Sequence, residues 1–210
     1  MTRIWLLVAS GLSVLFLLAL QLGTKPRDGV ALKELLFSTV CSELCFMDIY
    51  PGTTTFYEAH NILENNPWVA SVELIFRAPD APLETRNGSL RWRWNGLQPK
   101  LLHTPSLDAG EVDFENGIVH SIKVATSVSF GDAWLLLGQP AHGFIGTSRI
   151  YLGRFDNHVA VYNEQGIQLQ TLLPHAPRIA TFWNALVDVI FEPEPPEQQL
   201  YRLPCWLRCE

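Results

Sequence analysis

The sequence contains few charged residues, and most of those are acidic. Charged residues make up 17% of the 210 residues and hydrophobic ones 48%, a composition that excludes a mainly disordered chain. The first 27 residues hold three of the 15 basic residues and no acidic one, so the remainder has 12 bases against 21 acids, a net charge of −9. Because such a charge repels phosphate backbones, we expect no nucleic-acid partner.

Sequence motifs that mark common catalytic and cofactor sites are also absent. The chain has no phosphate-binding P-loop and no G-x-S-x-G motif, and its six histidines form no H-x-x-x-H or H-E-x-x-H pair. We therefore predict a protein without catalytic activity, bound metal or cofactor. The alternative is a hydrolase that uses loop residues around 142–156. In that case Ser148 would be the nucleophile, together with His142 and Asp156.

Cysteine is scarce, but its positions are informative. Two pairs with C-x3-C spacing, Cys41 with Cys45 and Cys205 with Cys209, stand at the two ends of the predicted folded part. An even number of cysteines favours structural disulfides in an oxidising compartment, and three connectivities are possible. The same spacing is also compatible with zinc bound by four thiolates.

A single long hydrophobic run lies near the N-terminus. Ile4 to Leu22 include no charged residue, and these 19 residues would span about 28 Å as a helix, close to the hydrocarbon thickness of a bilayer. The run predicts an uncleaved transmembrane helix, with a cleaved signal peptide as the alternative. Together with the cysteines, it predicts a single-pass cell-membrane protein whose C-terminal domain is extracytoplasmic.

The remaining residues predict two short helices and a series of strands. Thr55 with Glu58, and Ser129 with Asp132, have the spacing of helix N-terminal caps. Asn116-Gly117 predicts a tight hairpin turn. Hydrophobic patterning predicts strands at 68–77, 89–94, 111–114, 118–126, 147–155, 158–163, 167–173 and 183–191.

The two predicted helices belong to similar halves of the chain. Thr55–Leu63 aligns without gaps with Ser129–Leu137, and the capping residue, an aromatic, an acid, an alanine and the last leucine correspond. This self-similarity predicts a repeated helix-plus-sheet unit. The predicted domains are an anchor and tether at 1–27, a first repeat at 28–110, a second repeat at 111–191 and a proline-rich, cysteine-containing segment at 192–210.

Two segments carry a resemblance to known proteins. Pro51-Gly-Thr-Thr-Thr-Phe-Tyr-Glu-Ala59, followed by Asn66-Pro-Trp-Val69, resembles a group of uncharacterised single-pass bacterial envelope proteins. Ser129-Phe-Gly-Asp-Ala-Trp-Leu-Leu-Leu-Gly-Gln-Pro140 is similar to the signature of BamE/SmpA-type outer-membrane assembly lipoproteins, although the chain lacks their lipobox cysteine. A tandem of that unit is similar in architecture to the β-lactamase inhibitor protein. The resemblance covers about residues 50–175, and it implies noncatalytic protein binding.

The segment Arg91-Trp92-Arg93-Trp94 is the candidate contact surface. Alternation along a strand places the tryptophans on the core face and the arginines on the solvent face. Arg91 and Arg93 are therefore the expected partner contacts, because arginine is enriched in binding hot spots. The alternative is that the tryptophans are exposed and act as anchors.

Taken together, these patterns predict an α+β fold. It would consist of an N-terminal transmembrane helix followed by an extracytoplasmic antiparallel sheet with short helices, in two related repeats. The predicted function is that of a membrane-anchored module for protein binding or envelope assembly, without catalysis. Its expected partners are the membrane, through Ile4–Leu22, and a protein of the envelope.

Overall fold

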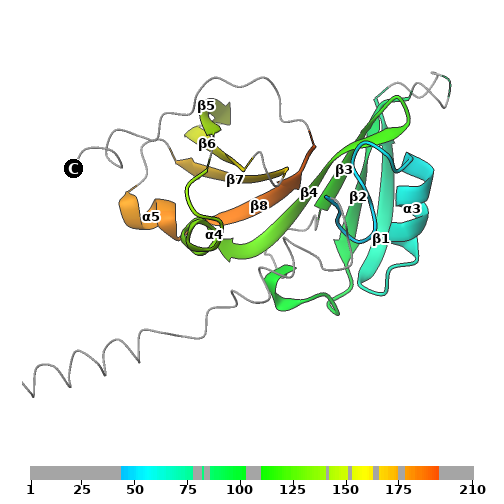
Figure 1. The fold of residues 1–210 in the computed structure, drawn as a ribbon, viewed down its shortest axis with the longest axis horizontal. Helices are drawn as coiled ribbons and strands as arrows, with labels where there is room; N and C mark the ends of the chain where they lie inside the picture. Colours follow the sequence, from blue (N-terminus) through cyan, green and yellow to red (C-terminus); the bar gives the residue numbers. More distant parts are fainter. Residues whose placement is uncertain are drawn as a thin grey trace, which may run out of the picture.

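The structure is a computed structural model, and it describes residues 44–77, 82, 86–102, 110–140, 142–150, 153–162, 166–174 and 178–193. These residues form an antiparallel sheet of eight strands in the order β1-β2-β3-β4-β8-β7-β6-β5 (Figure 1). The strands are β1 (Val69–Phe76), β2 (Gly88–Trp94), β3 (Gly110–Glu115), β4 (Ile118–Ser129), β5 (His142–Ile150), β6 (Gly153–Tyr162), β7 (Ile167–Pro174) and β8 (Leu186–Phe191). The helices are α3 (Phe56–Glu64), α4 (Phe130–Leu137), α5 (Ile179–Trp183) and the 3-10 helix η2 (Lys100–Leu102).

The strand order divides the sheet into two meanders. Strands β1 to β4 pair in chain order, and so do β5 to β8. The meanders join where β4 pairs with β8, with Val124 opposite Val189. One helix precedes each meander, α3 in the first case and α4 in the second. The predicted repeat stays a prediction. The boundary predicted between the two repeats, between residues 110 and 111, falls inside β3, which pairs with β2 on both sides of it.

The helix ends follow from local sequence, as predicted. Thr55 Oγ1 accepts a hydrogen bond from the Glu58 amide at 3.3 Å, and the Glu58 carboxylate accepts one from the Thr55 amide at 2.9 Å. This capping box fixes the start of α3. At the start of α4, Ser129 Oγ accepts a hydrogen bond from the Asp132 amide at 3.1 Å. Helix α4 ends at Leu137, and its C-cap is Gly138, where a φ of +79° favours glycine.

The hairpin prediction is confirmed, whereas the strands after α4 are shifted. Asn116 and Gly117, with φ of 49° and 76°, join β3 to β4. The strand predicted at 147–155 is wrong, because the chain reverses between Ile150 and Gly153, which lie opposite each other in β5 and β6. Helix α5 was not predicted, and β8 begins after it rather than at residue 183.

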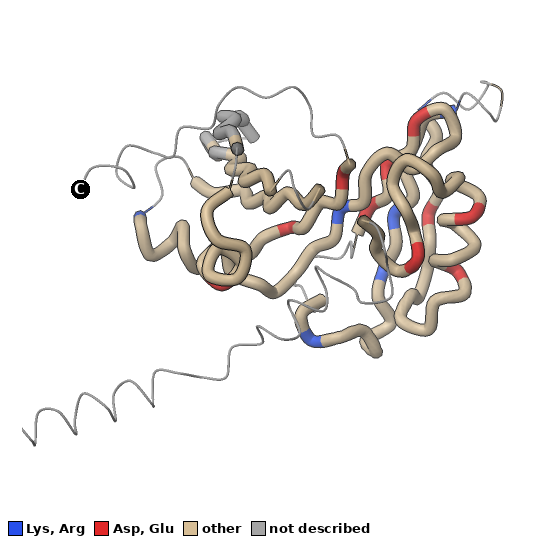
Figure 2. Tube along the Cα trace, in the orientation of Figure 1, with Lys and Arg blue, Asp and Glu red and all other residues tan. Residues whose placement is uncertain are grey.

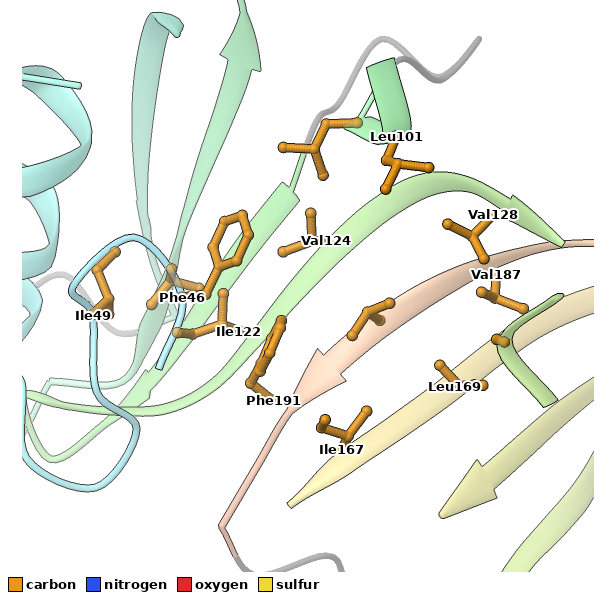
Figure 3. Close-up of a cluster of buried hydrophobic side chains, with 14 of the residues drawn as sticks. Phe46, Ile49, Leu101, Ile122, Val124, Val128, Ile167, Leu169, Val187 and Phe191 are labelled. Carbon is orange, nitrogen blue, oxygen red and sulfur yellow. The ribbon is translucent and has the colours of Figure 1, made fainter. Parts of the chain in front are cut away.

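The hydrophobic core lies on one face of the sheet. Figure 3 shows side chains of β4, β7 and β8 gathered there, among them Ile122, Ile167 and Phe191. Phe46 reaches this core from the segment before α3 and stacks on Trp92 of the first meander, with ring centroids 6.4 Å apart. Its ring also stacks on Phe191 of the second meander at 5.6 Å. Phe46 therefore connects the cores of the two meanders.

The helices cover this same face. Phe56 of α3 packs against Phe114 of β3, with ring centroids 4.9 Å apart. Phe182 of α5 packs against His158 of β6 at 5.3 Å. The opposite face of the first meander carries the charged residues of β2, β3 and β4, as the alternation of the strands requires.

The predicted fold class needs correction in its helical part. The described residues form mainly one sheet, and their longest helix has nine residues. Within the described ranges, no helix is long and apolar enough to span a membrane. The segment Ile4–Leu22 lies outside these ranges, so the structure gives no support to the predicted transmembrane helix or to a single-pass membrane protein.

The structure bears on the predicted disulfides at Cys45 alone, which is disulfide-bonded. Cys45 is the only one of the four cysteines that the structure describes, and it is buried at 6% exposure. Cys41, Cys205 and Cys209 lie outside the described residues. No disulfide therefore joins two residues of the described part of the chain.

Candidate functional site

The alternation predicted for Arg91-Trp92-Arg93-Trp94 is confirmed. Trp92 is 1% exposed and Trp94 is half-buried, whereas Arg91 and Arg93 are exposed on the other face of β2. Gly110 on the neighbouring strand makes room for the indole, because a Cβ there would lie 2.2 Å from the Trp92 ring. We call the side that carries Arg91 and Arg93 the arginine face.

The charges of the arginine face are largely compensated within the sheet. Arg91 Nε donates a hydrogen bond to Glu111 at 2.9 Å, and Glu111 lies opposite Lys123 in the next strand. Lys123 Nζ lies 3.1 Å from the carboxylate of Asp188 in β8 and donates a hydrogen bond to Gln170 at 2.9 Å. Figure 2 shows the resulting interleaving of acidic and basic residues along these strands. A partner would have to replace interactions that the sheet already provides.

One carboxyl on this face is perturbed by its surroundings. Partial burial raises the pKa of Asp113, and the neighbouring Glu111 carboxylate adds to the rise. Arg77, whose guanidinium lies 3.3 Å from Asp113, opposes it. The face is therefore a mixed-charge surface rather than a basic patch.

The residues of the alternative hydrolase do not come together along the backbone. His142 and Ser148 lie on the same strand, β5, six residues apart, which corresponds to about 20 Å. Asp156 lies on β6 opposite Thr147. A hydrogen bond requires about 3 Å between donor and acceptor, so this spacing does not favour a nucleophile–histidine pair. Among the described residues, no group of three or more potential metal ligands is found.

Helices α4 and α5 meet at one end of the sheet (Figure 1). A cluster of four aromatic rings forms where they meet. Phe130 and Phe182 form its buried floor, with ring centroids 4.7 Å apart. Trp134 and Trp183 form its half-buried rim and meet edge to face at 5.6 Å. Phe130 lies 5.9 Å from each tryptophan ring. The two indoles are thus held in place by rings that are themselves packed in the core.

Two aliphatic side chains extend this cluster to the surface. Leu135 is 70% exposed and Ile179 is 57% exposed. Leu135 follows Trp134 in α4, and Ile179 is one helical turn before Trp183 in α5. We call these two residues, together with the four rings, the aromatic corner.

A cavity of about 390 Å³ opens at the aromatic corner. Trp134, Leu135 and Trp183 form its apolar walls, and Ser129, Asp132 and Asn184 its polar side. Gly131 also lines the cavity, and a Cβ there would lie 3.0 Å from the Trp183 carbonyl oxygen. Glycine at this position therefore allows the end of α5 to approach the start of α4.

The polar side of the cavity is held by the cap of α4. Ser129 Oγ donates a hydrogen bond to the Asp132 carboxylate at 2.7 Å while it accepts one from the Asp132 amide. Asn184, the C-cap of α5, donates from its side chain to the Ala180 carbonyl at 2.8 Å. The carboxylate thus has a fixed position beside the tryptophans.

The aromatic corner was not among the predicted contact surfaces. One signal was available, because Trp134-Leu135-Leu136-Leu137 places four apolar residues in succession on an eight-residue helix. One face of a helix does not bury four consecutive residues, so at least one of them had to be exposed unless another element covered it. The other contributor, α5, was not predicted.

Comparisons of the chain with protein-family models, curated proteins and solved structures found no match. The resemblance to BamE/SmpA-type lipoproteins and to the β-lactamase inhibitor protein stays a prediction. The functional proposal therefore rests on the residues of the aromatic corner and the arginine face.

Proposed function

We propose that this protein is a noncatalytic protein-binding module that contacts its partner through the aromatic corner. The observation that carries the proposal is the exposure of Leu135 and Ile179 beside the half-buried Trp134 and Trp183. Contiguous apolar surface of this kind marks interaction sites in soluble domains, and tryptophan is enriched in binding hot spots.

The packing of the corner favours binding energetically. Trp134 and Trp183 contact Phe130, which is 2% exposed, so their rings are already positioned before a partner arrives. Less side-chain freedom is lost on association when the contacting groups are positioned in advance. The aliphatic side chains at the edge would add buried apolar area at about 25 cal/mol per Å².

The arginine face is the second candidate surface. Arg93 is exposed on β2, and arginine side chains commonly contribute to interfaces. Arg91, however, already pairs with Glu111. Removing this ion pair from water on binding would cost free energy, and this cost would offset part of the gain from a new contact. We therefore rank this surface below the aromatic corner.

The proposal is tested by comparing variants of the full chain in quantitative capture of proteins from the source cells. Leu135→Asp and Ile179→Asp place charge in the corner, whereas Leu97→Asp makes the same change at a leucine that is 72% exposed in a loop outside it. We expect a partner that the wild type and Leu97→Asp retain and that both corner variants lose by at least tenfold.

Two results would contradict the proposal. A partner retained by both corner variants but lost on combined Arg91→Ala and Arg93→Ala substitution would move the interface to the arginine face. Equal losses with Leu97→Asp and the corner variants would show that the capture does not depend on this surface at all.

A further inference from the structure

We propose that the free edge of β1 takes up an extended segment of a partner protein as an additional strand, with a lysine or arginine of that segment opposite Glu73. This edge shares no residue with the cavity of the aromatic corner, so the contact is a second one, beyond the proposed function. Three features of β1 support it: its place in the sheet, the direction of its backbone groups and the charge of Glu73.

Strand β1 lies at one end of the sheet. Among the described residues it pairs with β2 alone, so its other side carries backbone groups with no strand beside them. The strand has eight residues and no proline, and its register with β2 is regular from Ser71 to Phe76. Sheets that avoid further pairing have short, bulged or covered edges. A long regular edge can instead accept an extended segment of another protein.

The hydrogen bonds between β1 and β2 show which backbone groups face the free edge. The Arg77 amide at the end of β1 donates to the Asn87 carbonyl at 2.9 Å. Because hydrogen-bonded pairs recur at every second residue of an antiparallel pair, Glu73, four residues earlier, bonds to β2 in the same way. The amides and carbonyls of its neighbours Val72 and Leu74 therefore point to the free edge.

The side chains of β1 alternate between the two faces of the sheet. Val72 and Leu74 pack against the core, where Phe76 meets Phe56 of α3 edge to face, with ring centroids 5.9 Å apart. Helix α3 lies against β1 on this side (Figure 1). Glu73 is the only charged residue of β1, and it is exposed on the arginine face. An added strand would place one row of side chains beside the core and the other beside Glu73.

Charge alternates across the sheet at the level of Glu73. The residues that lie opposite one another in β1 to β4 are Glu73, Arg91, Glu111 and Lys123. Arg91 donates a hydrogen bond to Glu111 at 2.9 Å, and none of the hydrogen bonds or ion pairs found among the described residues involves the Glu73 carboxylate. Opposite charges that face each other across strands attract, and like charges repel. A base in the added strand would therefore continue the alternation.

The position opposite Glu73 suits an ion pair. Val72 and Leu74 would form the hydrogen bonds to the added strand, so Glu73 would face it at a non-hydrogen-bonded position, where opposing side chains are closest. The neighbours of the basic residue would lie beside Val72 and Leu74 on the core side. The expected segment therefore has an apolar residue on each side of the lysine or arginine.

Two other interpretations of this edge predict different behaviour. A charge in the middle of an edge strand can serve only to prevent pairing with other chains, and the edge would then bind no strand. A second copy of the chain could also occupy the edge, but a pairing centred on Glu73 would place two carboxylates opposite each other. The formal net charge of −6 favours a basic segment over an acidic one at long range.

The experiment uses the full chain labelled with 15N and peptides about seven residues long, a usual strand length. In the lysine peptide, valine alternates with threonine and the central residue is lysine. The glutamine and glutamate peptides differ from it at the central residue alone. A further peptide carries N-methyl groups on the two valines beside the lysine, which removes the donors that would reach Val72 and Leu74.

Hydrogen exchange and titration report on the edge directly. We expect the amides of Val72 and Leu74 to exchange rapidly in the free chain and at least about tenfold more slowly with the lysine peptide bound. The lysine peptide should bind about threefold more tightly than the glutamine peptide and about tenfold more tightly than the glutamate peptide, as one cross-strand ion pair implies. The N-methylated peptide should not bind.

The variant Glu73→Gln keeps the size of the side chain and removes its charge, so it should bind the three unmethylated peptides within about twofold of one another. The matched control is Glu115→Gln, which removes one negative charge from an exposed residue of β3, two strands from the edge, and should keep the preference for lysine. Leu135→Asp in the aromatic corner should leave peptide binding unchanged, so failure of one proposed contact can be told apart from failure of the other.

Slow exchange of Val72 and Leu74 in the free chain would overturn the inference, because the edge would already be occupied. Protection that rises with protein concentration would identify a second copy as the occupant. Absence of peptide binding, equal binding of the lysine and glutamate peptides, or an undiminished preference in Glu73→Gln would overturn it as well.

Discussion

Trp92 occupies the part of the core that lies directly beneath the arginine face. Its indole is 1% exposed and contacts Phe46, while its neighbours Arg91 and Arg93 point the other way. On this strand, Trp92 therefore contributes to the stability of the core, whereas Arg91 and Arg93 are available at the surface.

We predict that Trp92→Ala lowers the free energy of unfolding by about 3–5 kcal/mol, because the truncated side chain leaves a cavity in a packed core. Arg93→Ala on the same strand should change it by less than about 0.5 kcal/mol. Urea denaturation of the two variants measures both values. Similar small losses in the two variants would contradict the assignment of Trp92 to the core.

The capping box of α3 gives a prediction about acid titration. The Thr55 amide and hydroxyl donate to the Glu58 carboxylate and hold its pKa below the ordinary value. This stabilising contribution is present above the ordinary glutamate pKa and is lost as the pH falls through the lowered one. Thr55→Ala removes the hydroxyl but keeps the amide, so the pKa of Glu58 should rise part of the way back.

An NMR titration of the Glu58 carboxyl carbon measures that rise, and the same variant should lose about 1 kcal/mol of stability with its N-cap. Thr53→Ala is the control, because the Thr53 hydroxyl donates to the Tyr50 carbonyl instead. An unchanged pKa of Glu58 in Thr55→Ala would show that the capping box does not persist in solution.

At the scale of elements, the two meanders depend on the pairing of β4 with β8. The register of this pair shifts between Ala125 and Ser129. Within the irregular stretch, the buried Thr126 hydroxyl donates to the Val187 carbonyl at 2.6 Å and accepts from the Val128 amide at 3.3 Å. One side chain thus replaces backbone pairing that the shift interrupts.

Thr126→Val keeps the shape of the side chain and removes both hydrogen bonds. We expect it to lower the free energy of unfolding by about 1–3 kcal/mol, because the buried Val187 carbonyl loses its donor. Thr126→Ser keeps the hydroxyl and should cost less than the valine variant in the same urea measurements. A valine variant as stable as the wild type would rule out this role for Thr126.

Structural features that neighbouring residues in the chain determine could be predicted from the sequence. Features that depend on contacts between residues far apart in the chain could not. The caps at Thr55 and Ser129 and the turn at Asn116-Gly117 involve only neighbours in the chain, and the structure confirms them. The reversal between Ile150 and Gly153 has no comparable turn signal, so the strand predicted at 147–155 ran across it.

The candidate site was predictable only in part for the same reason. Alternation placed Arg91 and Arg93 on the exposed face of β2, and the structure confirms that orientation. The exposure of Leu135 was indicated only by the four successive apolar residues at the end of α4, and Ile179 lies on α5, which was not predicted. The part of the predicted fold class that needs correction is the transmembrane helix, since no helix of the described residues is long and apolar enough to span a membrane.

At the scale of the whole molecule, the aromatic corner adjoins the β4–β8 pair, because Ser129 lines its cavity and lies opposite Leu186 of β8. Helix α3 covers the first meander, and α4 and α5 lie at the other end of the sheet (Figure 1). The Leu135 side chain itself is mostly exposed on α4. Substitutions at Leu135 can therefore alter binding while the fold is preserved.

The most direct test of the central claim is photo-crosslinking in living cells with a photoreactive phenylalanine analogue placed at single exposed positions. The analogue at position 135 or 179 lies in the aromatic corner, at position 93 on the arginine face, and at position 97 outside both. The account predicts a discrete adduct with one partner protein from positions 135 and 179 and none from 97. Adducts from position 93 alone, or equal adducts from 97 and 135, would contradict it.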